Sequence, residues 1–440
     1  MTTDIKEVTD YLYKIPRFAR TGGLSMTAER LKLLGNPQDT FKYIHVAGTN
    51  GKGSVCAFME RCLRKAGFKT GLFTSPHLVK INERIQIDRE NVGDETFCRA
   101  FERVKALVDD QAAQGIAHPT FFEFIYLMAM VIFAEAGIEY GVIETGLGGR
   151  MDLTNVIQAP ELTIITSIGR DHTAILGDTI GQIAGEKAGI IKSGIPVIYL
   201  DDKPEAARVI KRRADEVGAP AFPVEKEWIE DAQIRDGQIR FAFRCPYGQK
   251  YDIILNTSGI YQIENCSIAL SAMEILRARE PELYALPAEA FRQMLTQAVE
   301  ETRWAGRMER IRENIYVDGA HNDDGVRKLT ESLRAAFKDR QIILVFAVAE
   351  DKDYQQMAAH LCTLPNLRRI IVTELDNGRR RDHREVMEDF SRKWHGNISG
   401  TYNVNKAIET AVHMMEPEDV LICTGSLYLV GHVKEMLGGI

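Results

Sequence analysis

A strand that runs into a glycine-rich turn and then into a helix places the strongest constraint on how this chain can fold. Residues 41–46 are mostly aromatic and β-branched, which is typical of a buried parallel strand. Three glycines follow at close spacing, Gly48, Gly51 and Gly53. Residues 55–65 then have the apolar spacing of a helix that ends before Gly67. Because glycines let the backbone turn tightly and point its N–H groups inward, the segment predicts a phosphate-binding loop at a helix N-terminus.

The spacing of this loop departs from the general pattern G-x-x-x-x-G-K-[ST]. That pattern would need a glycine at Val46 and a hydroxyl directly after Lys52, where Gly53 stands. Lys52 could still reach the terminal phosphates of ATP, and the Ser54 hydroxyl could touch Mg²⁺. The alternative is a tight strand-to-helix turn with an exposed lysine. The other motifs of the chain favour a protein that handles ATP.

The composition limits the class of protein. With 440 residues, of which 45% are hydrophobic, the chain can bury more than one core, and we expect two domains. A net charge of -7 provides no basic field for nucleic acid, and the run at 379–381 (RRR) is typical of a solvated loop, although it could help to hold an anionic group.

The cysteines and the hydropathy of the chain indicate the cellular compartment of the protein. Seven cysteines form no C-x-x-C pair, which favours free thiols in a reducing compartment. Residues 1–14 lack the apolar core of a signal peptide. Residues 121–134 are too short to span a bilayer and include Glu123, so a buried helix is expected there. We therefore expect a cytoplasmic protein without a membrane or nucleic-acid partner.

Short apolar strands alternate with amphipathic helices along most of the chain. The first series of strands is expected at 70–73, 140–143, 162–167 and 196–200. This alternation predicts an α/β fold with a doubly wound, mostly parallel sheet and helices on both faces. From about residue 221 to 256 polar and apolar residues alternate, which predicts an antiparallel meander at the edge of that sheet.

A second α/β series follows a linker at 301–307. Its strands are expected at 315–317, 342–347, 369–373 and 420–423, with helices between them. The pattern predicts a smaller Rossmann-like domain. The chain is thus expected to divide into an ATP-binding domain of residues 1–300 and a second α/β domain of residues 301–440.

Polar residues follow several of the predicted strands, at the sheet edge where ligands bind in such folds. Glu144 ends one strand and is followed by glycines, so its carboxylate could hold Mg²⁺. Neutral His172, after the next strand, could bind or orient a second divalent ion, or Asp171 and His172 could be a capping aspartate and a hydrogen-bonded histidine. The turn 74–77 (TSPH) could face the phosphates, although such a sequence is usually only a turn.

Lys187 lies in a predicted helix that is otherwise rich in small and apolar residues. It could pair with Glu186 or another carboxylate, or it could be partly buried, shifted toward neutrality and open to modification. In the second domain Arg307, Asp318 and His321 supply a guanidinium, a carboxylate and an imidazole that could clamp a nucleotide from the other side. A guanidinium there would stabilise charge on a transferring phosphoryl group.

Seven motifs, taken in order, resemble those of the folylpolyglutamate synthase/dihydrofolate synthase family of the Mur ligase superfamily. They are residues 48–54 (GTNGKGS), 74–77 (TSPH), 144–150 (ETGLGGR), 171–173 (DHT), 186–189 (EKAG), 306–307 (GR) and 318–322 (DGAHN). The resemblance extends from about residue 20 to 430. It identifies residues 1–300 as similar to the central ATP-binding domain of Mur ligases and residues 301–440 as similar to their glutamate-ligase domain.

The resemblance implies an ATP-dependent amide ligase that adds L-glutamate to tetrahydrofolate, and also to dihydropteroate, through an acyl phosphate. ATP would phosphorylate a carboxylate of the acceptor, and the amine of glutamate would then attack. The cofactors would be ATP and two Mg²⁺ ions, the partners would be these small molecules, and a monomer would suffice because the cleft lies between two domains of one chain.

The resemblance also implies roles for single residues. The metal would be held by Ser75, Glu144 and His172. ATP would be bound by Gly48, Thr49, Asn50, Gly51, Lys52, Gly53, Ser54, Asn265, Arg307 and Asp318. The catalytic group would comprise Lys187, which resembles a lysine that becomes carbamylated, together with His172, Glu144, Arg307 and His321. The pterin would be bound by Thr120, Phe122, Glu123, Asp152 and Leu153, with Phe122 stacked on the ring and Phe121 in the core.

The sequence departs from the family pattern at three points. Tyr261 stands before Gln262 where many members have histidine, Cys266 replaces a frequent alanine, and residues 347–353 (AVAEDKD) lack the glycine usual before D-K-D. These departures leave open the details of the adenine and glutamate sites, the latter expected near His321 and residues 424–426.

Two other functions are open to this sequence. A nucleotide-dependent switch or binding protein would use the glycine loop without ligation, but it gives no role to Glu144, His172 and Lys187 together. A Mur ligase of the cell-wall type would act on a nucleotide-linked peptide. Gly53, inserted between Lys52 and Ser54, favours the folate branch instead.

Overall fold

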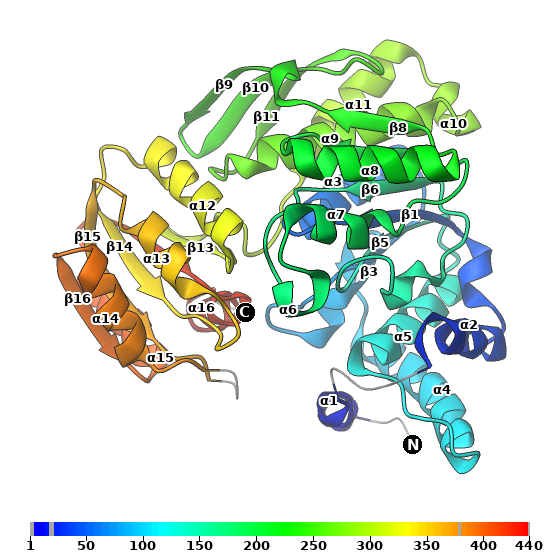
Figure 1. The fold of residues 1–440 in the computed structure, drawn as a ribbon, viewed down its shortest axis with the longest axis horizontal. Helices are drawn as coiled ribbons and strands as arrows, with labels where there is room; N and C mark the ends of the chain where they lie inside the picture. The colour runs from blue at the N-terminus through cyan, green and yellow to red at the C-terminus, as the bar shows by residue number, and fades with distance from the viewer. Residues whose placement is uncertain (1–3, 17–21, 377–379, 439–440) are drawn as a thin grey trace.

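Two α/β units lie side by side in the computed structural model, which describes residues 4–16, 22–376 and 380–438 (Figure 1). The first unit, coloured from blue to light green, carries the larger sheet, and the second, coloured from yellow to red, carries the smaller one. The expected α/β fold with two series of strands is therefore confirmed.

The sheet of the first unit has eight strands. They are β1 (Lys42–Ala47), β2 (Thr70–Phe73), β3 (Ile85–Ile87), β4 (Glu90–Asn91), β5 (Tyr140–Glu144), β6 (Leu162–Ile165), β7 (Val197–Leu200) and β8 (Ala221–Val224). Their order is β4-β3-β2-β5-β1-β6-β7-β8. The pairs between β2 and β8 in this order are parallel, and the short β3 and β4 add an antiparallel edge. This arrangement confirms the predicted doubly wound, mostly parallel sheet.

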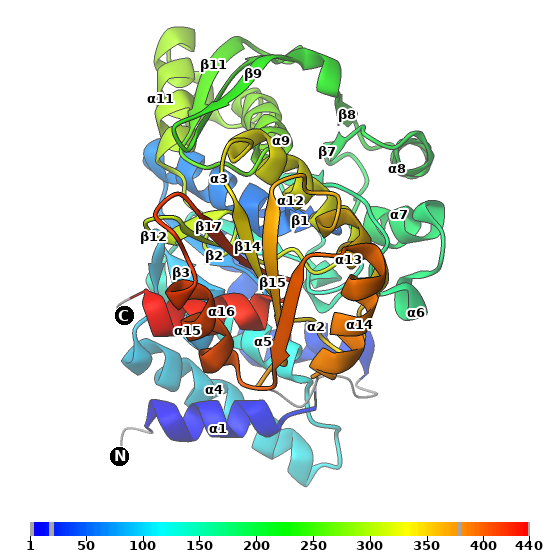
Figure 2. The ribbon, with the colours of Figure 1, turned by 90° about the vertical axis from the view of Figure 1, so that its left-hand side faces the viewer.

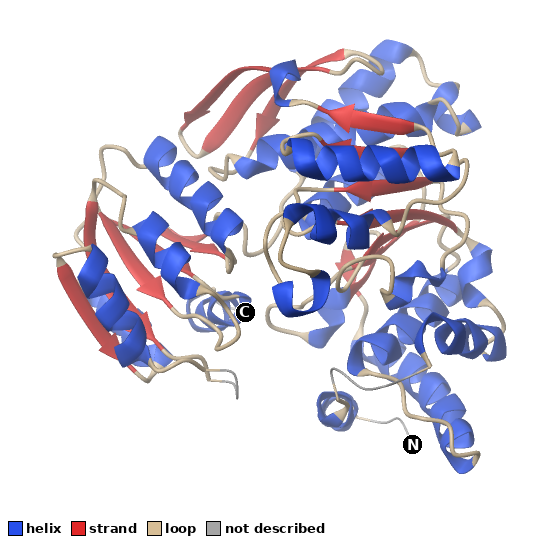
Figure 3. Cartoon of the chain, viewed as in Figure 1, coloured by secondary structure: helices blue, strands red, loops and turns tan. Residues whose placement is uncertain are grey.

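Helices cover both faces of this sheet (Figure 3). One face packs on α3 (Lys52–Lys65), α9 (Tyr261–Arg277) and α11 (Ala288–Glu301), and the other on α1 (Ile5–Lys14), α2 (Gly23–Leu33), α4 (Asp94–Ala113), α5 (Phe121–Ala136), α7 (Ile180–Ala188) and α8 (Pro204–Val217). The short α6 (Thr173–Leu176), α10 (Pro281–Tyr284) and 3-10 turns η1 (Pro37–Thr40), η2 (Ile81–Arg84), η3 (Leu153–Val156) and η4 (Lys226–Trp228) complete the unit. Because successive strand residues point to opposite faces, Ile44 of β1 joins one core and Tyr43 the other.

The predicted meander at the sheet edge is wrong in its placement. Residues 221–224 form β8, which is parallel to β7. The rest forms a separate antiparallel sheet of β9 (Ile229–Arg235), β10 (Gln238–Arg244) and β11 (Lys250–Leu255). Polar and apolar residues alternate along these strands, so the sheet has one apolar face. This face includes Phe241 and Phe243 and packs in the core with α9 and α11. The strands therefore bury their apolar side without joining the main sheet.

The second unit is a six-stranded sheet between two layers of helices, and it faces the viewer in Figure 2. Its strands are β12 (Glu309–Arg312), β13 (Ile315–Asp318), β14 (Ile342–Phe346), β15 (Leu367–Thr373), β16 (Asn397–Thr401) and β17 (Val420–Thr424), in the order β12-β13-β17-β14-β15-β16. One face packs on α12 (Asp323–Ala336), α13 (Tyr354–Leu361) and α14 (His383–Lys393), the other on α15 (Val404–His413) and α16 (Leu427–Leu437). All pairs except β12–β13 are parallel, which confirms the Rossmann-like prediction.

Residues 302–308 connect the two units, between the end of α11 and the start of β12. The predicted division into residues 1–300 and 301–440 stays a prediction; its boundary falls at the last residue of α11.

Two predictions from composition can be compared with the structure. All seven cysteines are free, as expected. In the part of the chain that the structure describes, no helix is long and apolar enough to cross a membrane. The apolar segment at 121–134 forms the buried helix α5, as predicted.

An ion pair between Arg30 and Glu123 lies in the core of the N-terminal part of the first unit. Both side chains are fully buried, and Arg30 NH1 lies 2.7 Å from Glu123 Oε1. The same carboxylate oxygen accepts a hydrogen bond from Thr27 Oγ1 at 2.9 Å, and Arg30 Nε donates to Gln111 Oε1 at 2.9 Å. The pair thus joins α2, α4 and α5 by polar contacts within an apolar core.

We expect the substitution Glu123→Ala to lower the free energy of unfolding by about 3–5 kcal/mol, because it leaves the Arg30 charge buried without its partner. Equilibrium unfolding in urea, monitored by circular dichroism, measures this loss. Glu135→Ala is the matched control, since it removes a carboxylate of α5 that pairs with Arg103 at the surface. It should change the free energy of unfolding by about 1 kcal/mol or less. Equal effects of the two substitutions would contradict the assigned role of the buried pair.

Candidate active site

The glycine loop between β1 and α3 is packed tightly against its neighbours. Gly48 has φ +155° and Gly51 has φ +89°, both in the region that favours glycine. A Cβ atom at Gly48 would lie 1.8 Å from Thr166 Oγ1, and one at Gly51 would lie 2.3 Å from Asn265 Oδ1. Gly51 is also the N-cap of α3, so the free N–H groups of this helix open at the loop. The sequence therefore forms the predicted anion-binding geometry.

Lys52, Ser75 and Glu144 meet at the carboxyl ends of the neighbouring strands β1, β2 and β5. Lys52 Nζ lies 3.7 Å from Glu144 Oε1. The other oxygen of Glu144 accepts a hydrogen bond from the Ser75 N–H at 3.1 Å. Burial raises the pKa of Glu144, and Lys52 and the Ser75 N–H oppose that shift. A buried carboxylate of this kind is the hard oxygen ligand that Mg²⁺ prefers, so Glu144 fits the predicted metal, and ligation by Ser75 and His172 stays a prediction.

Lys187 is buried beside the same loop, and its ammonium donates to the Gly48 carbonyl oxygen at 2.7 Å. Burial, followed by the charge of Lys52, lowers the pKa of Lys187 to about 7. The alternative in which Lys187 pairs with Glu186 is wrong, because Glu186 binds Arg150 at 2.8 Å and no ion pair of Lys187 occurs among the described residues. The structure thus has the buried lysine with a lowered pKa of the second interpretation, and its modification stays a prediction.

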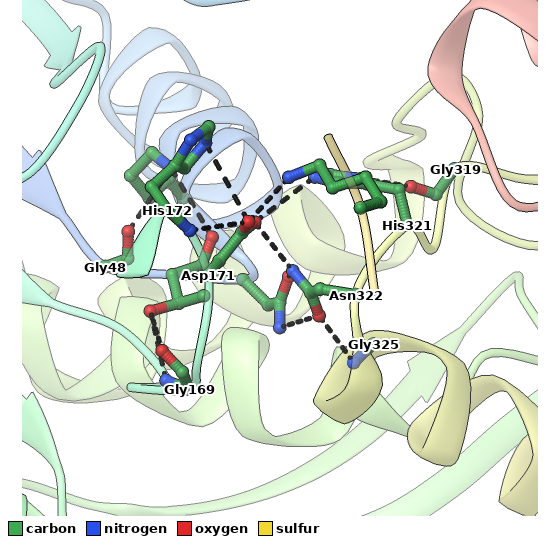
Figure 4. A network of polar contacts seen from close by, with 12 residues as sticks. Gly48, Gly169, Asp171, His172, Gly319, His321, Asn322 and Gly325 are labelled. Carbon is green, nitrogen blue, oxygen red and sulfur yellow. Dashed lines mark hydrogen bonds and ion pairs between the residues drawn. The ribbon is translucent and has the colours of Figure 1, made fainter. Parts of the chain in front are cut away.

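Asp171 joins the two units at the centre of a polar network (Figure 4). Its carboxylate lies 2.5 Å from Lys352 Nζ, 3.5 Å from His321 Nε2 and 3.0 Å from Asn322 Nδ2, all three in the second unit. These cationic and hydrogen-bonding partners hold the pKa of Asp171 far below its usual range, against the effect of burial. Neighbouring His172 is 41% exposed in its side chain, and desolvation of its remaining part lowers its pKa to about 4 against the opposing charge of Asp171, which favours a neutral ring at pH 7.

A cavity between the two units collects most of the residues predicted to bind a nucleotide. It is lined by Asn50, Gly51, Ser54, Asn265, Arg307 and Asp318. The remaining loop residues have other contacts: Thr49 Oγ1 donates to the Gly169 carbonyl at 3.0 Å, and Gly53 faces the ring of Trp304. The Ser54 hydroxyl is buried and accepts a hydrogen bond from Gln262 Nε2 at 3.1 Å. Because this bond uses one acceptor position of the hydroxyl and Ser54 lines the cavity, its metal contact stays a prediction.

Some residues that line the same cavity were not predicted as site residues from the sequence, namely Tyr261, Glu264, Asp324, Arg327 and Lys328. Tyr261 adjoins Gln262 in the sequence, and Asp324 follows the motif at 318–322 by two residues. Their position close to a motif could have identified Tyr261 and Asp324 as candidates. It does not indicate which unit each side chain faces.

The residues predicted to bind a pterin do not all lie together. Some adjoin the loop after Glu144, whereas Glu123 lies in the core. Phe122 and Asp152 meet at the loop after Glu144: the ring of Phe122 lies against Gly146, and the Asp152 carboxylate accepts from the Leu147 N–H at 2.7 Å. Leu153 begins η3 next to Asp152, and Thr120 caps α5. The expected contact of Glu123 with substrate is not supported, because Glu123 is fully buried in its ion pair with Arg30.

One further cluster in the second unit was not expected. Glu374, Asp382 and His383 could each offer a ligand atom to a metal ion. His383 Nδ1 already lies 2.7 Å from Glu374 Oε1 in an ion pair. Of the basic run at 379–381, Arg379 lies outside the described residues, and Arg381 donates to the Glu350 carbonyl oxygen.

Comparison with known proteins agrees with this architecture. Residues 46–273 match the Mur ligase middle domain and residues 306–427 match the Mur ligase glutamate ligase domain. A Bacillus subtilis dihydrofolate synthase/folylpolyglutamate synthase is 34% identical, over 99% of this chain and 100% of its own length. The crystal structure of Mycobacterium tuberculosis folylpolyglutamate synthase complexed with ADP superimposes with a TM-score of 0.88 at 28% identity, over 99% of this chain and 98% of that one. For E. coli FolC in complex with DHPP and ADP, the TM-score is 0.82 at 25% identity, over 99% of this chain and 98% of that one.

The domain matches span both units in the order of the sequence motifs, and the relatives align over nearly their whole length. The chain therefore belongs to the folylpolyglutamate synthase/dihydrofolate synthase family of Mur ligases.

Proposed function

We propose that this protein is an ATP-dependent ligase that adds L-glutamate to tetrahydrofolate and also to dihydropteroate. The observation that carries the proposal is the cavity between the units, lined by Gly51 and Ser54 on one side and by Arg307 and Asp318 on the other. A nucleotide in this cavity would contact both units, as a ligase that closes around ATP requires. The names of the B. subtilis and M. tuberculosis relatives, and the ADP in two of the related structures, support the same activity.

The proposed reaction has two steps. A carboxylate oxygen of the acceptor attacks the terminal phosphorus of ATP, and the bond from that phosphorus to ADP breaks. The amine of glutamate then attacks the carbonyl carbon of the acyl phosphate, loses a proton, and displaces inorganic phosphate. The N–H groups at the start of α3 would bind the phosphates, and Lys52 and Arg307 would stabilise the charge that develops on them.

Ser75, Glu144 and His172 would hold two Mg²⁺ ions, which neutralise phosphate charge when bound. Glu144 supports this assignment because it is buried with Lys52 as its nearest cation, so a second positive charge would further stabilise its ionised form. Neutral His172 supports it as a nitrogen ligand. His321 would stay near the reacting groups through Asp171, from which its Nε2 lies 3.5 Å.

Lys187 would act after modification. Its neutral amine would add to CO₂ and release a proton, which gives a carbamate with the charge of a carboxylate. The pKa of about 7 supports the proposal because an appreciable fraction of the amine is neutral at physiological pH. The pterin would lie against Phe122, with Thr120, Asp152 and Leu153 around it. Because the cavity is completed within one chain, we propose a monomer, and the free cysteines support a cytoplasmic location.

Glutamate-dependent release of ADP tests the proposed function. Purified protein with Mg²⁺, ATP and glutamate should release ADP when either dihydropteroate or tetrahydrofolate is added, and mass spectrometry should find the acceptor heavier by one glutamyl unit. Omission of glutamate is the control. Nucleotide binding without any amide product would favour the switch or binding protein instead, and a product with only one acceptor would reduce the proposal to that activity.

We expect Lys187→Ala to reduce turnover about 10–100-fold, the range seen when a group that supports a metal site is removed. Calorimetry should find its affinity for ADP nearly unchanged, because Lys187 donates to the Gly48 carbonyl rather than to a group that faces the cavity. Lys192→Ala is the matched control, since Lys192 is also partly buried with a lowered pKa but lies near the Asn155 carbonyl. Near-normal turnover of Lys187→Ala would contradict the proposed role.

Gly53 breaks the general loop pattern. The segment that connects the two units packs against it through Trp304. A Cβ atom at Gly53 would lie 2.9 Å from Cζ2 of Trp304. The Trp304 ring also contacts Arg89, whose guanidinium carbon lies 5.2 Å from the ring centroid. A larger residue at position 53 would therefore displace the segment that leads to Arg307.

Gly53→Ala should lower kcat/KM for ATP about tenfold. Alanine would favour helix α3 by about 1 kcal/mol, so the loss would arise from the displaced Trp304 and not from unfolding. Steady-state kinetics combined with thermal unfolding separate the two effects. Gly93→Ala, at a position where a Cβ meets open space, is the matched control. The double variant Gly53→Ala/Trp304→Phe should recover part of the activity; a fully active Gly53→Ala would show that this contact does not position Arg307.

A further inference from the structure

Tyr261 belongs to the first unit by sequence but packs into the second. It is the first residue of α9, whose other residues pack in the core of the first unit. Its ring, in contrast, packs against the apolar core of the second unit under α12 and α13. Its hydroxyl donates a hydrogen bond to Asp318 Oδ2, at the end of β13. One side chain thus joins the units inside the cavity that both of them line.

The carboxylate of Asp318 has almost no freedom to turn. Oδ1 accepts from the Ala320 N–H at 2.9 Å, and Oδ2 accepts from the Met308 N–H at 2.9 Å as well as from Tyr261. A carboxylate has about four acceptor positions, so these three donors leave about one, in a fixed direction. The side chain is 1% exposed, and Asp318 lines the cavity between the units.

The first turn of α9 also holds the glycine loop. Gln262, directly after Tyr261, donates from Nε2 to Ser54 Oγ at 3.1 Å. Asn265 donates from Nδ2 to Gln262 Oε1 at 2.8 Å, and its own Oδ1 lies where a Cβ of Gly51 would be. A single helical turn therefore contacts the loop of the first unit on one side and Asp318 of the second unit on the other.

We propose that Tyr261 is a positioning residue for the nucleotide, one that acts through Asp318 and fixes the distance between Asp318 and the glycine loop. The inference rests on the proposed ATP-dependent function. A carboxylate cannot donate to phosphate and would repel it, so Asp318 accepts from the hydroxyl or N–H groups of the nucleoside part. Tyr261 orients that acceptor, while Gln262 orients the loop that takes the phosphates.

The Tyr261→Phe variant tests the hydroxyl separately from the ring. Because the aromatic ring remains, the units should stay docked, and Asp318 should lose one of its three donors. We expect KM for ATP and the dissociation constant for ADP to rise about tenfold, a typical effect of losing a hydrogen bond to a charged group. The value of kcat should change less than about twofold, because the contact is made equally before and during the reaction.

Tyr251→Phe is the matched control. Tyr251 also donates from a buried hydroxyl to a carboxylate, that of Glu274, but neither residue lines the cavity. It should leave KM for ATP and the affinity for ADP unchanged. An equal loss of nucleotide affinity in both variants would overturn the proposal, because it would show a general effect of lost buried hydrogen bonds. Wild-type nucleotide affinity in Tyr261→Phe would overturn it directly.

The pH dependence provides a readout that a purely structural role would not change. Burial raises the pKa of Asp318, and Arg307 and the Tyr261 hydroxyl oppose that shift; these two are the titratable groups that face it. Without the hydroxyl the pKa should rise further, so nucleotide affinity should fall at a higher pH than in the wild type as the pH is lowered. An unchanged acid limb would argue against the proposal. Because ADP binding is measured without acceptor or glutamate, its outcome stands apart from a failure of the ligase activity itself.

Discussion

The close packing of the glycine loop is the constraint on which the rest of the site depends. Three different elements approach its backbone at positions without a side chain: Thr166 after β6 at Gly48, Asn265 of α9 at Gly51, and Trp304 of the connecting segment at Gly53. A Cβ atom at any of these glycines would lie within 3 Å of its neighbour. The loop is therefore both the predicted anion site and the surface against which Thr166, helix α9 and the connection between the units pack. Gly53, which breaks the general spacing, is the position that meets Trp304.

Burial and the neighbouring charges together determine the pKa of each ionisable group around the loop. Lys187 meets no carboxylate among the described residues within ion-pair distance, so desolvation dominates and lowers its pKa. Asp171 is also largely buried, yet three partners from the second unit hold its pKa far below the usual range. The difference is physical: a buried charge is retained where donors and opposite charges replace water, and is lost where they do not. The site thereby has an amine with a lowered pKa and a fixed anion within one cluster.

The contacts between the units explain why a nucleotide-dependent switch is the weaker interpretation. Lys203 of the first unit pairs with Asp324 of the second at 2.7 Å, whereas Lys328 of the second pairs with Glu264 of the first at 2.8 Å. Each unit thus supplies a cation to the contact between them, and residues of both units line the cavity. A protein that only binds and releases a nucleotide through the glycine loop would not need Arg307 and Asp318 in the same cavity.

Local patterns in the sequence predicted the central strands of both sheets and their order along the chain, but not the edge strands β3, β4, β12 and β16. Strand and helix periodicity predicted both sheets, and the glycine loop, Glu144, His172 and Lys187 were found because each follows a strand or interrupts an apolar helix. Tertiary structure alone decided which side chains meet. Glu123 pairs with Arg30 across 93 positions of the chain, and Tyr261 bonds Asp318 across 57. The three-stranded sheet likewise packs on helices instead of extending the main sheet. Periodicity in the sequence indicates which face of a helix or strand is apolar, because that is a local property. It does not indicate which distant element covers that face, because packing in three dimensions selects the partner.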